Sequence, residues 1–238
     1  MKKTKRIAIL ALLLALTVIL SLIPIQVSSA TLALTLLPVF VLALTQDFVT
    51  GLLGGLVMGI TSLVMAFTLN AGSPTAPIFQ NPLVSIFPRV MVPAVAYLVM
   101  KGLSAVANRV NLRRYSSEVY RRIPSDGAEY KTERQAAAES SSSSPLSRTA
   151  KKRRAGGGVP GLAQAFIDGF ACLCGVLANT GLVLGMMWAI YGGQSVNDTL
   201  ISPEFMSAML SINFVIEVIL FPLITPPVVR AVRKSNAR

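Results

Sequence analysis

The chain has 238 residues, of which 53% are hydrophobic and only 13% are charged. A soluble globular domain carries about 25% charged residues, so this composition indicates a membrane protein and excludes an ordinary soluble domain. The net charge is +12, but the basic residues lie in flanks and in one long loop, so we expect no nucleic-acid partner. The chain has no histidine, which removes the commonest acid/base and metal ligand, and we expect neither a metal nor a cofactor.

Six apolar segments approach or exceed the length of a membrane-spanning helix, which is about 20 residues with a range of about 17 to 25. The second segment falls slightly below this range, and must be buried by its neighbours or extended. The segments are residues 7–25, 31–45, 48–69, 83–107, 162–191 and 205–229.

We therefore predict an all-α fold, a polytopic membrane protein that forms a six-helix bundle with a long disordered cytoplasmic loop. Residues 1–107 hold the first four helices, residues 108–160 form the loop, and residues 161–238 hold the last two. The loop contains a serine run and a basic cluster at residues 151–154. It lacks an apolar face, so burial cannot offset the entropy lost on ordering. The basic cluster either binds anionic membrane lipid or only fixes the topology, and we favour the second alternative.

The basic residues also predict the orientation. They precede the first apolar segment, follow the last, and fill the stretch 101–154, whereas residues 71–80 and 192–203 contain no Lys or Arg. By the positive-inside rule we predict a multi-pass protein of the cell membrane with both termini in the cytoplasm. Residues 1–30 also resemble a cleavable signal peptide, but the apolar stretch 7–25 exceeds the usual signal core of about 7–15 residues, which favours a retained helix.

Polar residues inside the apolar segments predict a ligand site. Arg89 is the clearest case, because a charge within a span is costly unless it faces a cavity, a partner or a ligand. Helical rise places Asn179, Asn213 and Glu217 between the outer surface and the midplane, with the last two on one helix face. The candidate substrate-binding residues are Asn81, Arg89, Asn179, Trp188, Asn213 and Glu217.

The alternative is structural. Arg89 and Glu217 would then form an ion pair that holds the bundle together. Trp188 alone is more often a residue of the membrane interface. Asp168 lies near the start of the fifth segment, where the helix dipole favours an acid, and we interpret it as structural.

Small residues predict close helix packing. Ala11 and Ala15 in the first segment have the small-xxx-small spacing that lets helix backbones approach in lipid. An external partner and internal packing are both open for this pair. Gly51, Gly55 and Gly59 in the third segment line one face, and internal packing suffices to explain them.

No motif of an enzyme or of an energy-converting domain is present. The sequence lacks G-x-x-x-x-G-K-[ST], G-x-S-x-G and H-E-x-x-H, so we expect no ATP-binding P-loop and no enzyme activity. A self-sufficient secondary carrier and, less favoured, an intramembrane enzyme remain the alternatives. Inverted repeats, which many secondary carriers contain, are not obvious.

Four stretches carry a resemblance to a known family. Residues 81–89, 178–185, 212–217 and 225–229, together with the pair Ala11 and Ala15, resemble the substrate-specific S component of energy-coupling factor (ECF) vitamin transporters. The long loop 108–160 departs from the compact family pattern.

The resemblance implies six helices, a vitamin pocket near the outer face, and a first helix that docks through its alanine face onto a membrane scaffold subunit with two cytoplasmic ATPase subunits. It also implies that the S component tips over in the membrane to release its ligand. Family substrates include riboflavin, folate, thiamine, biotin, pantothenate and pyridoxine-type compounds. Because Arg89 suits a carboxylate or another anion, we favour a pantothenate-like or folate-like substrate.

Overall fold

The computed structural model describes residues 3–22, 25–27, 30–32, 34–121, 161–197 and 199–236. It divides into a larger unit, residues 1–101 with 165–238, and a smaller unit, residues 102–164. Within the described residues, the chain is helical except for turns and two short hairpins. This confirms the predicted helical class.

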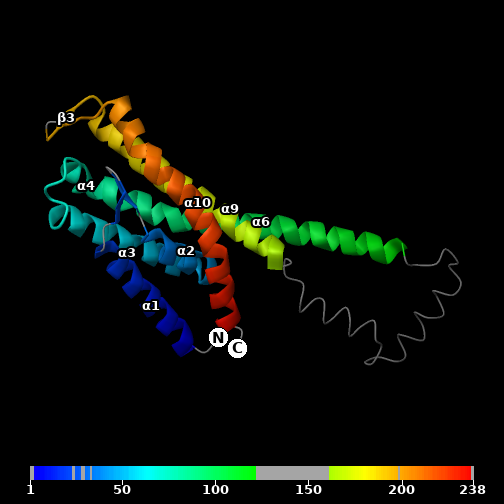
Figure 1. The fold of residues 1–238 in the computed structure, drawn as a ribbon. Helices are drawn as coiled ribbons and strands as arrows, with labels where there is room; N and C mark the ends of the chain where they lie inside the picture. Colours follow the sequence, from blue (N-terminus) through cyan, green and yellow to red (C-terminus); the bar gives the residue numbers. More distant parts are fainter. Residues whose placement is uncertain are drawn as a thin grey trace, which may run out of the picture. The chain divides into compact units, whose positions relative to one another are not determined.

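The elements follow one another along the chain as Figure 1 shows. The first half holds α1 (Lys3–Leu22), β1 (Ile25–Val27), β2 (Ala30–Leu32), α2 (Leu36–Thr45), α3 (Phe48–Phe67), α4 (Ala76–Phe79), α5 (Pro82–Ser85) and α6 (Phe87–Arg121). The second half holds α9 (Gly161–Tyr191), β3 (Ser195–Val196), β4 (Thr199–Leu200) and α10 (Pro203–Asn236). Both hairpins are antiparallel, with Gln26 opposite Thr31 in the first and Val196 opposite Thr199 in the second.

Each of the six predicted segments contains a described helix, but the first two helices are shorter than predicted: α1 ends at Leu22, and α2 begins only at Leu36, because residues 31–32 belong to β2. Four of the six, within α3, α5–α6, α9 and α10, are long and apolar enough to cross a membrane, and residues 7–22 and 36–45 form two shorter apolar helices. The short second segment is buried by its neighbours, since residues 38–44 of α2 are all buried. This pattern is that of a multi-pass membrane protein.

The core of the larger unit forms where α2 meets its neighbours. α2 packs against α1, α3 and α10. Its Phe40 side chain lies edge-on to Phe221 of α10, with ring centroids 5.9 Å apart. A Cβ atom on Gly175 of α9 would lie 2.4 Å from the Phe40 ring, so a glycine is needed there for α9 to approach α2.

The fourth predicted segment differs from the expectation at both of its ends. We expected one helix over residues 83–107, but α5 ends at Ser85 and α6 begins at Phe87. Pro88 explains this break, because proline has no N–H to donate to the Val84 carbonyl and its ring clashes with that carbonyl in a continuous helix. At the other end, α6 continues past residue 107 and ends at Arg121. The first strong helix breaker after Gly102 is Pro124. The rest of the predicted loop, with the basic cluster 151–154, lies outside the described residues.

Two ends of the larger unit serve as reference points. At one end α1 begins and α10 ends (Figure 1), and we call it the terminal end. At the other, α4 and the β3–β4 hairpin lie beside the end of α9 and the start of α10, and we call it the hairpin end.

Candidate functional site

The break between α5 and α6 positions the Arg89 side chain. Because Pro88 carries no N–H, the carbonyl of Val84 loses the donor that a continuous helix would supply. Arg89 takes that place: its Nη1 donates to the carbonyl oxygens of Ser85, at 2.9 Å, and Val84, at 3.3 Å. The guanidinium carbon also lies 5.7 Å from the centroid of the Phe79 ring, within the range of a cation–π contact. The turn therefore fixes the arginine head group in one place.

The guanidinium keeps donor capacity after these bonds. An arginine carries several N–H donors and no acceptor, and both backbone bonds use Nη1. The Nε atom is buried and has no hydrogen-bond partner among the described residues. Glu217 of α10 is 5% exposed, and its carboxylate lies near enough to act electrostatically on Arg89. The predicted cation and the predicted anion therefore interact electrostatically within the larger unit.

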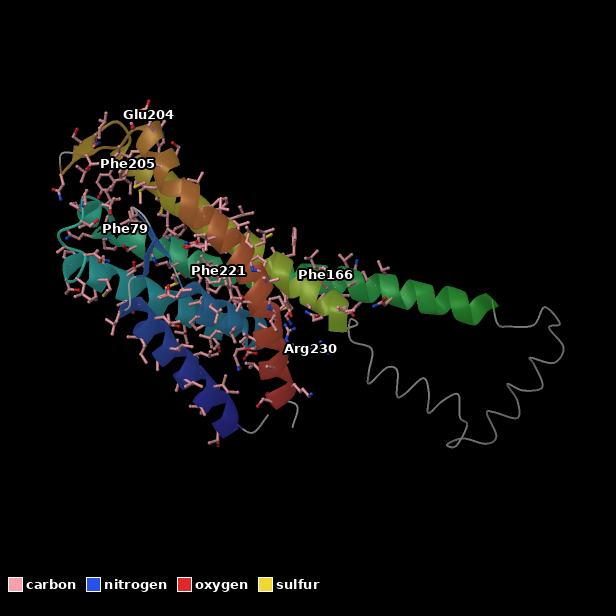
Figure 2. All side chains as sticks on the ribbon, viewed as in Figure 1. Phe79, Phe166, Glu204, Phe205, Phe221 and Arg230 are labelled. Atoms are coloured by element: carbon pink, nitrogen blue, oxygen red, sulfur yellow. The ribbon has the colours of Figure 1, made fainter. Side chains whose placement is uncertain are left out.

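An apolar cluster fills the hairpin end. Its fully buried members come from α4, α5, α9 and the segment after β4, and partly buried residues of α9 and α10 pack around them. Figure 2 shows Phe79 and Phe205 at this end of the unit. Methionine is flexible and polarisable, so a methionine-rich cluster can repack around an inserted group. Its methionines and aromatic residues are Phe79, Met186, Met187, Tyr191, Phe205, Met206 and Met209.

The polar candidates lie one or two helical turns from this cluster, toward the terminal end. On α9, Asn179 precedes the cluster residue Val183 by one turn, or about 6 Å. Its Oδ1 atom is buried and has no hydrogen-bond partner among the described residues. On α10, Glu217 follows Met209 by about two turns. Asn213 lies on α10 between them, and its side chain is outside the described residues. The site is thus a polar layer next to an apolar one.

Asn81 uses its amide to fix the turn before Arg89. Its Oδ1 accepts from the Leu83 N–H at 3.0 Å, which caps the start of α5. Its Nδ2 donates to the Tyr191 hydroxyl at 3.3 Å, which joins α5 to the end of α9. The Ser85 hydroxyl donates to the Phe79 carbonyl in the same turn. Asn81 therefore stabilises the turn before Arg89 and joins it to the end of α9.

The structure does not bring Trp188 into the cluster. Trp188 is 46% exposed, whereas the preceding residue Met187 is fully buried. The indole lies against the turn at Gly192, where a Cβ atom would come within 3.0 Å of the ring. This exposure is typical of a residue of the membrane interface, the alternative given above for Trp188.

The alanine pair of α1 is exposed. Ala11 and Ala15 both face away from the larger unit, while Leu13 and Thr17 are buried and form the inward side of the helix. The Thr17 hydroxyl donates to the Leu13 carbonyl at 2.8 Å, so it needs no partner outside its own helix. The pair is therefore available to an external helix.

An ion pair at the terminal end was missed by the sequence analysis. Arg233 of α10 donates from Nη1 to Asp168 Oδ2 at 2.6 Å and from Nη2 to Asp168 Oδ1 at 3.1 Å. Its Nη2 also donates to the Leu44 carbonyl at 2.8 Å. We expected Asp168 to act through the helix dipole, but the structure gives it a charged partner 65 residues away. No sequence signal joins residues so far apart.

The comparisons with known proteins place the chain in a family. A family model for the substrate-specific component of ECF transporters matches residues 5–229. The chain belongs to this family. The comparison with curated proteins gives no significant match. As an S component the chain is a transporter subunit that binds a small-molecule substrate, and its family works with scaffold and ATPase subunits. Among the described residues, no group of His, Cys, Asp and Glu side chains could hold a metal ion.

Proposed function

We propose that this S component binds an anionic B-type vitamin or a related small molecule, pantothenate-like or folate-like, for import driven by partner ATPases. One observation carries the proposal. Arg89 has a buried Nε donor without a hydrogen-bond partner among the described residues, at the edge of an apolar cluster that contains Phe79. A ligand carboxylate would supply acceptors for the guanidinium, which binds such groups through paired hydrogen bonds.

The two layers of the site support an amphiphilic ligand. The anionic group would meet Arg89 in the polar layer, and the apolar part would lie among the methionines and aromatic residues of the hairpin end. Asn179 and Glu217 offer acceptors to N–H or O–H groups of the ligand. Glu217 also acts electrostatically on Arg89, and this attraction offsets part of the cost of burying both charges when the site is empty.

The proposed orientation puts the hairpin end outside the cell. The distribution of Lys and Arg supports it, since α10 ends with Arg233 and Lys234 at the terminal end, whereas residues 192–203 contain neither. Both termini would then lie in the cytoplasm, on the side of the ATPases. The exposed face of Ala11 and Ala15 would dock onto the membrane scaffold subunit, because small side chains let helices approach closely in lipid.

The test is reconstitution of the purified chain in liposomes with a panel of B vitamins. Binding without net uptake, followed by ATP-dependent uptake when scaffold and ATPase subunits are added, is the expected result. Uptake driven by an ion gradient in the chain alone would identify a secondary carrier. Conversion of a vitamin by the purified chain would identify an enzyme. Either of these two results, or binding of none of the vitamins, would contradict the proposal.

A further inference from the structure

We propose that Gly55 and Gly59 of α3 are positioning residues for Arg89. Their missing side chains let the α5–α6 junction lie directly on the α3 backbone, and this contact sets where the guanidinium stands. The inference rests on the proposed function for its effect on ligand affinity. The position of the junction itself does not depend on a ligand and can be measured without one.

The nearest atom to each of these two glycines is a backbone atom, and side-chain atoms of Pro93 and Ile86 lie close beside them. A Cβ atom on Gly55 would lie 2.4 Å from the Arg89 carbonyl oxygen and 3.0 Å from Val90 Cα. A Cβ atom on Gly59 would lie 2.9 Å from Ile86 Cα and 3.3 Å from the Ile86 carbonyl oxygen. Backbone atoms cannot rotate aside as the end of a side chain can, so any side chain here must push the two segments apart.

Displacement of the junction moves the arginine head group with it. The nearest atom to Gly55 belongs to Arg89 itself, and the guanidinium is bonded to the carbonyls of Val84 and Ser85 in the same turn. The turn and its arginine would therefore shift as one piece. Glu217 and Asn179 stand on α10 and α9, so the shift changes the distances between the three polar groups that face a ligand.

The neighbouring Gly54 provides a matched control. It is buried on the same helix one residue earlier. The three atoms nearest to a Cβ atom at Gly54 would all belong to the Leu42 side chain, and the closest is Cδ1, at 2.8 Å. The end of a leucine side chain can change rotamer to make room. Gly54→Ala therefore tests the loss of a buried glycine on α3 without displacing the α5–α6 junction.

The first experiment measures the affinity of the full chain for pantothenate and for folate. For a vitamin that binds, Gly55→Ala or Gly59→Ala should weaken the affinity about tenfold or more, as expected when a charged hydrogen bond is lost. The control Gly54→Ala should change the affinity less than about threefold. In an Arg89→Ala background, Gly55→Ala should have no further effect on affinity, because its action runs through the arginine. An equal loss in Gly54→Ala, or a further loss in the Arg89→Ala background, would overturn the inference.

The second experiment needs no ligand. Spin labels at Leu83 of α5 and Val215 of α10, which are both exposed, report the distance between the junction and α10 in a chain whose two cysteines are replaced by serine. Gly55→Ala should shift this distance and Gly54→Ala should leave it unchanged. An unchanged distance in Gly55→Ala would refute the positioning role. If Arg89→Ala leaves the affinity of a bound vitamin unchanged, the proposed function fails, and the spin-label distance still decides this inference.

Discussion

Arg233 closes a bidentate ion pair on Asp168, whose carboxylate is 2% exposed, and the same guanidinium caps the carbonyl of Leu44 at the end of α2. Three helices, α2, α9 and α10, thus share one charged contact at the terminal end. At the hairpin end the cluster packs mainly through apolar side chains, with the Asn81–Tyr191 hydrogen bond at its border. The terminal end is therefore held by a charged contact, whereas the cluster at the hairpin end is held mainly by apolar packing.

Arg233→Ala should destabilise the protein strongly. The substitution removes the Arg233 guanidinium from the buried Asp168 carboxylate, and breaking comparable buried pairs costs about 3–5 kcal/mol. Arg230→Ala is the matched control, since Arg230 is exposed on the same helix. Thermal or denaturant unfolding in detergent measures the difference. The double variant Asp168→Asn with Arg233→Met should recover part of the loss, and equal stabilities of the two single arginine variants would contradict the role of the pair.

The helical segments could be predicted from the sequence because their signal is local. Apolar runs of sufficient length define membrane helices whatever lies around them, and the burial of α2 followed from its short length. The break before α6 was not predicted, because the apolar run continues through Pro88 and the proline was not taken as a helix breaker. Helix continuation to Arg121 was missed because a polar composition was given more weight than the absence of a breaker before Pro124.

The candidate site could be predicted only in part. Arg89 and Glu217 were predicted because a charge in an apolar span is costly. The apolar cluster was not, because apolar residues face both lipid and neighbouring helices, and periodicity cannot tell these faces apart in a membrane helix. The Asp168–Arg233 pair joins distant residues, and sequence spacing contains no information about it.

Arg89→Ala should weaken vitamin binding by about 1.5–3 kcal/mol, because it removes a charged hydrogen bond to the ligand. Arg89→Lys should recover only part of the affinity, since an ammonium group cannot reproduce the planar fork of a guanidinium. Lys101→Ala, an exposed cation on the same helix, is the control. Isothermal titration of the purified chain measures all three variants. An Arg89→Ala variant that binds and transports like the wild type would refute the proposed site.

Glu217→Gln distinguishes two roles of the buried carboxylate. If Glu217 only balances the charge of Arg89, the change should leave an anionic ligand bound as tightly or more tightly and should lower the stability of the protein. If Glu217 accepts hydrogen bonds from ligand hydroxyl or amide groups, affinity should fall while stability changes little. Ligand titration and thermal unfolding of the same preparation measure the two quantities together. No change in either quantity would exclude both roles.

Bulky residues at the alanine pair of α1 should separate binding from transport. Ala11→Trp or Ala15→Trp should leave vitamin binding near normal, since both alanines are exposed, and should block assembly with the scaffold subunit, because close helix approach needs small side chains. Leu12→Trp is the control, as Leu12 is a large residue that is already 69% exposed on the same helix. Co-purification with the scaffold and ATP-driven uptake measure the effect. Joint loss of binding and expression would show that the alanines pack within the chain.

The orientation of the chain predicts a labelling pattern. In a variant whose two native cysteines are replaced by serine, a cysteine at Ser73, in the turn before α4, should react with an impermeant thiol reagent added outside intact cells. A cysteine at Ser142, in the segment between α6 and α9 that lies outside the described residues, should react only after the membrane is permeabilised. The positive-inside rule supports this pattern, because residues 71–80 contain no Lys or Arg and residues 101–154 are rich in both. The opposite labelling pattern would place the hairpin end, and with it the candidate site, on the cytoplasmic side, where it could not collect a vitamin from outside.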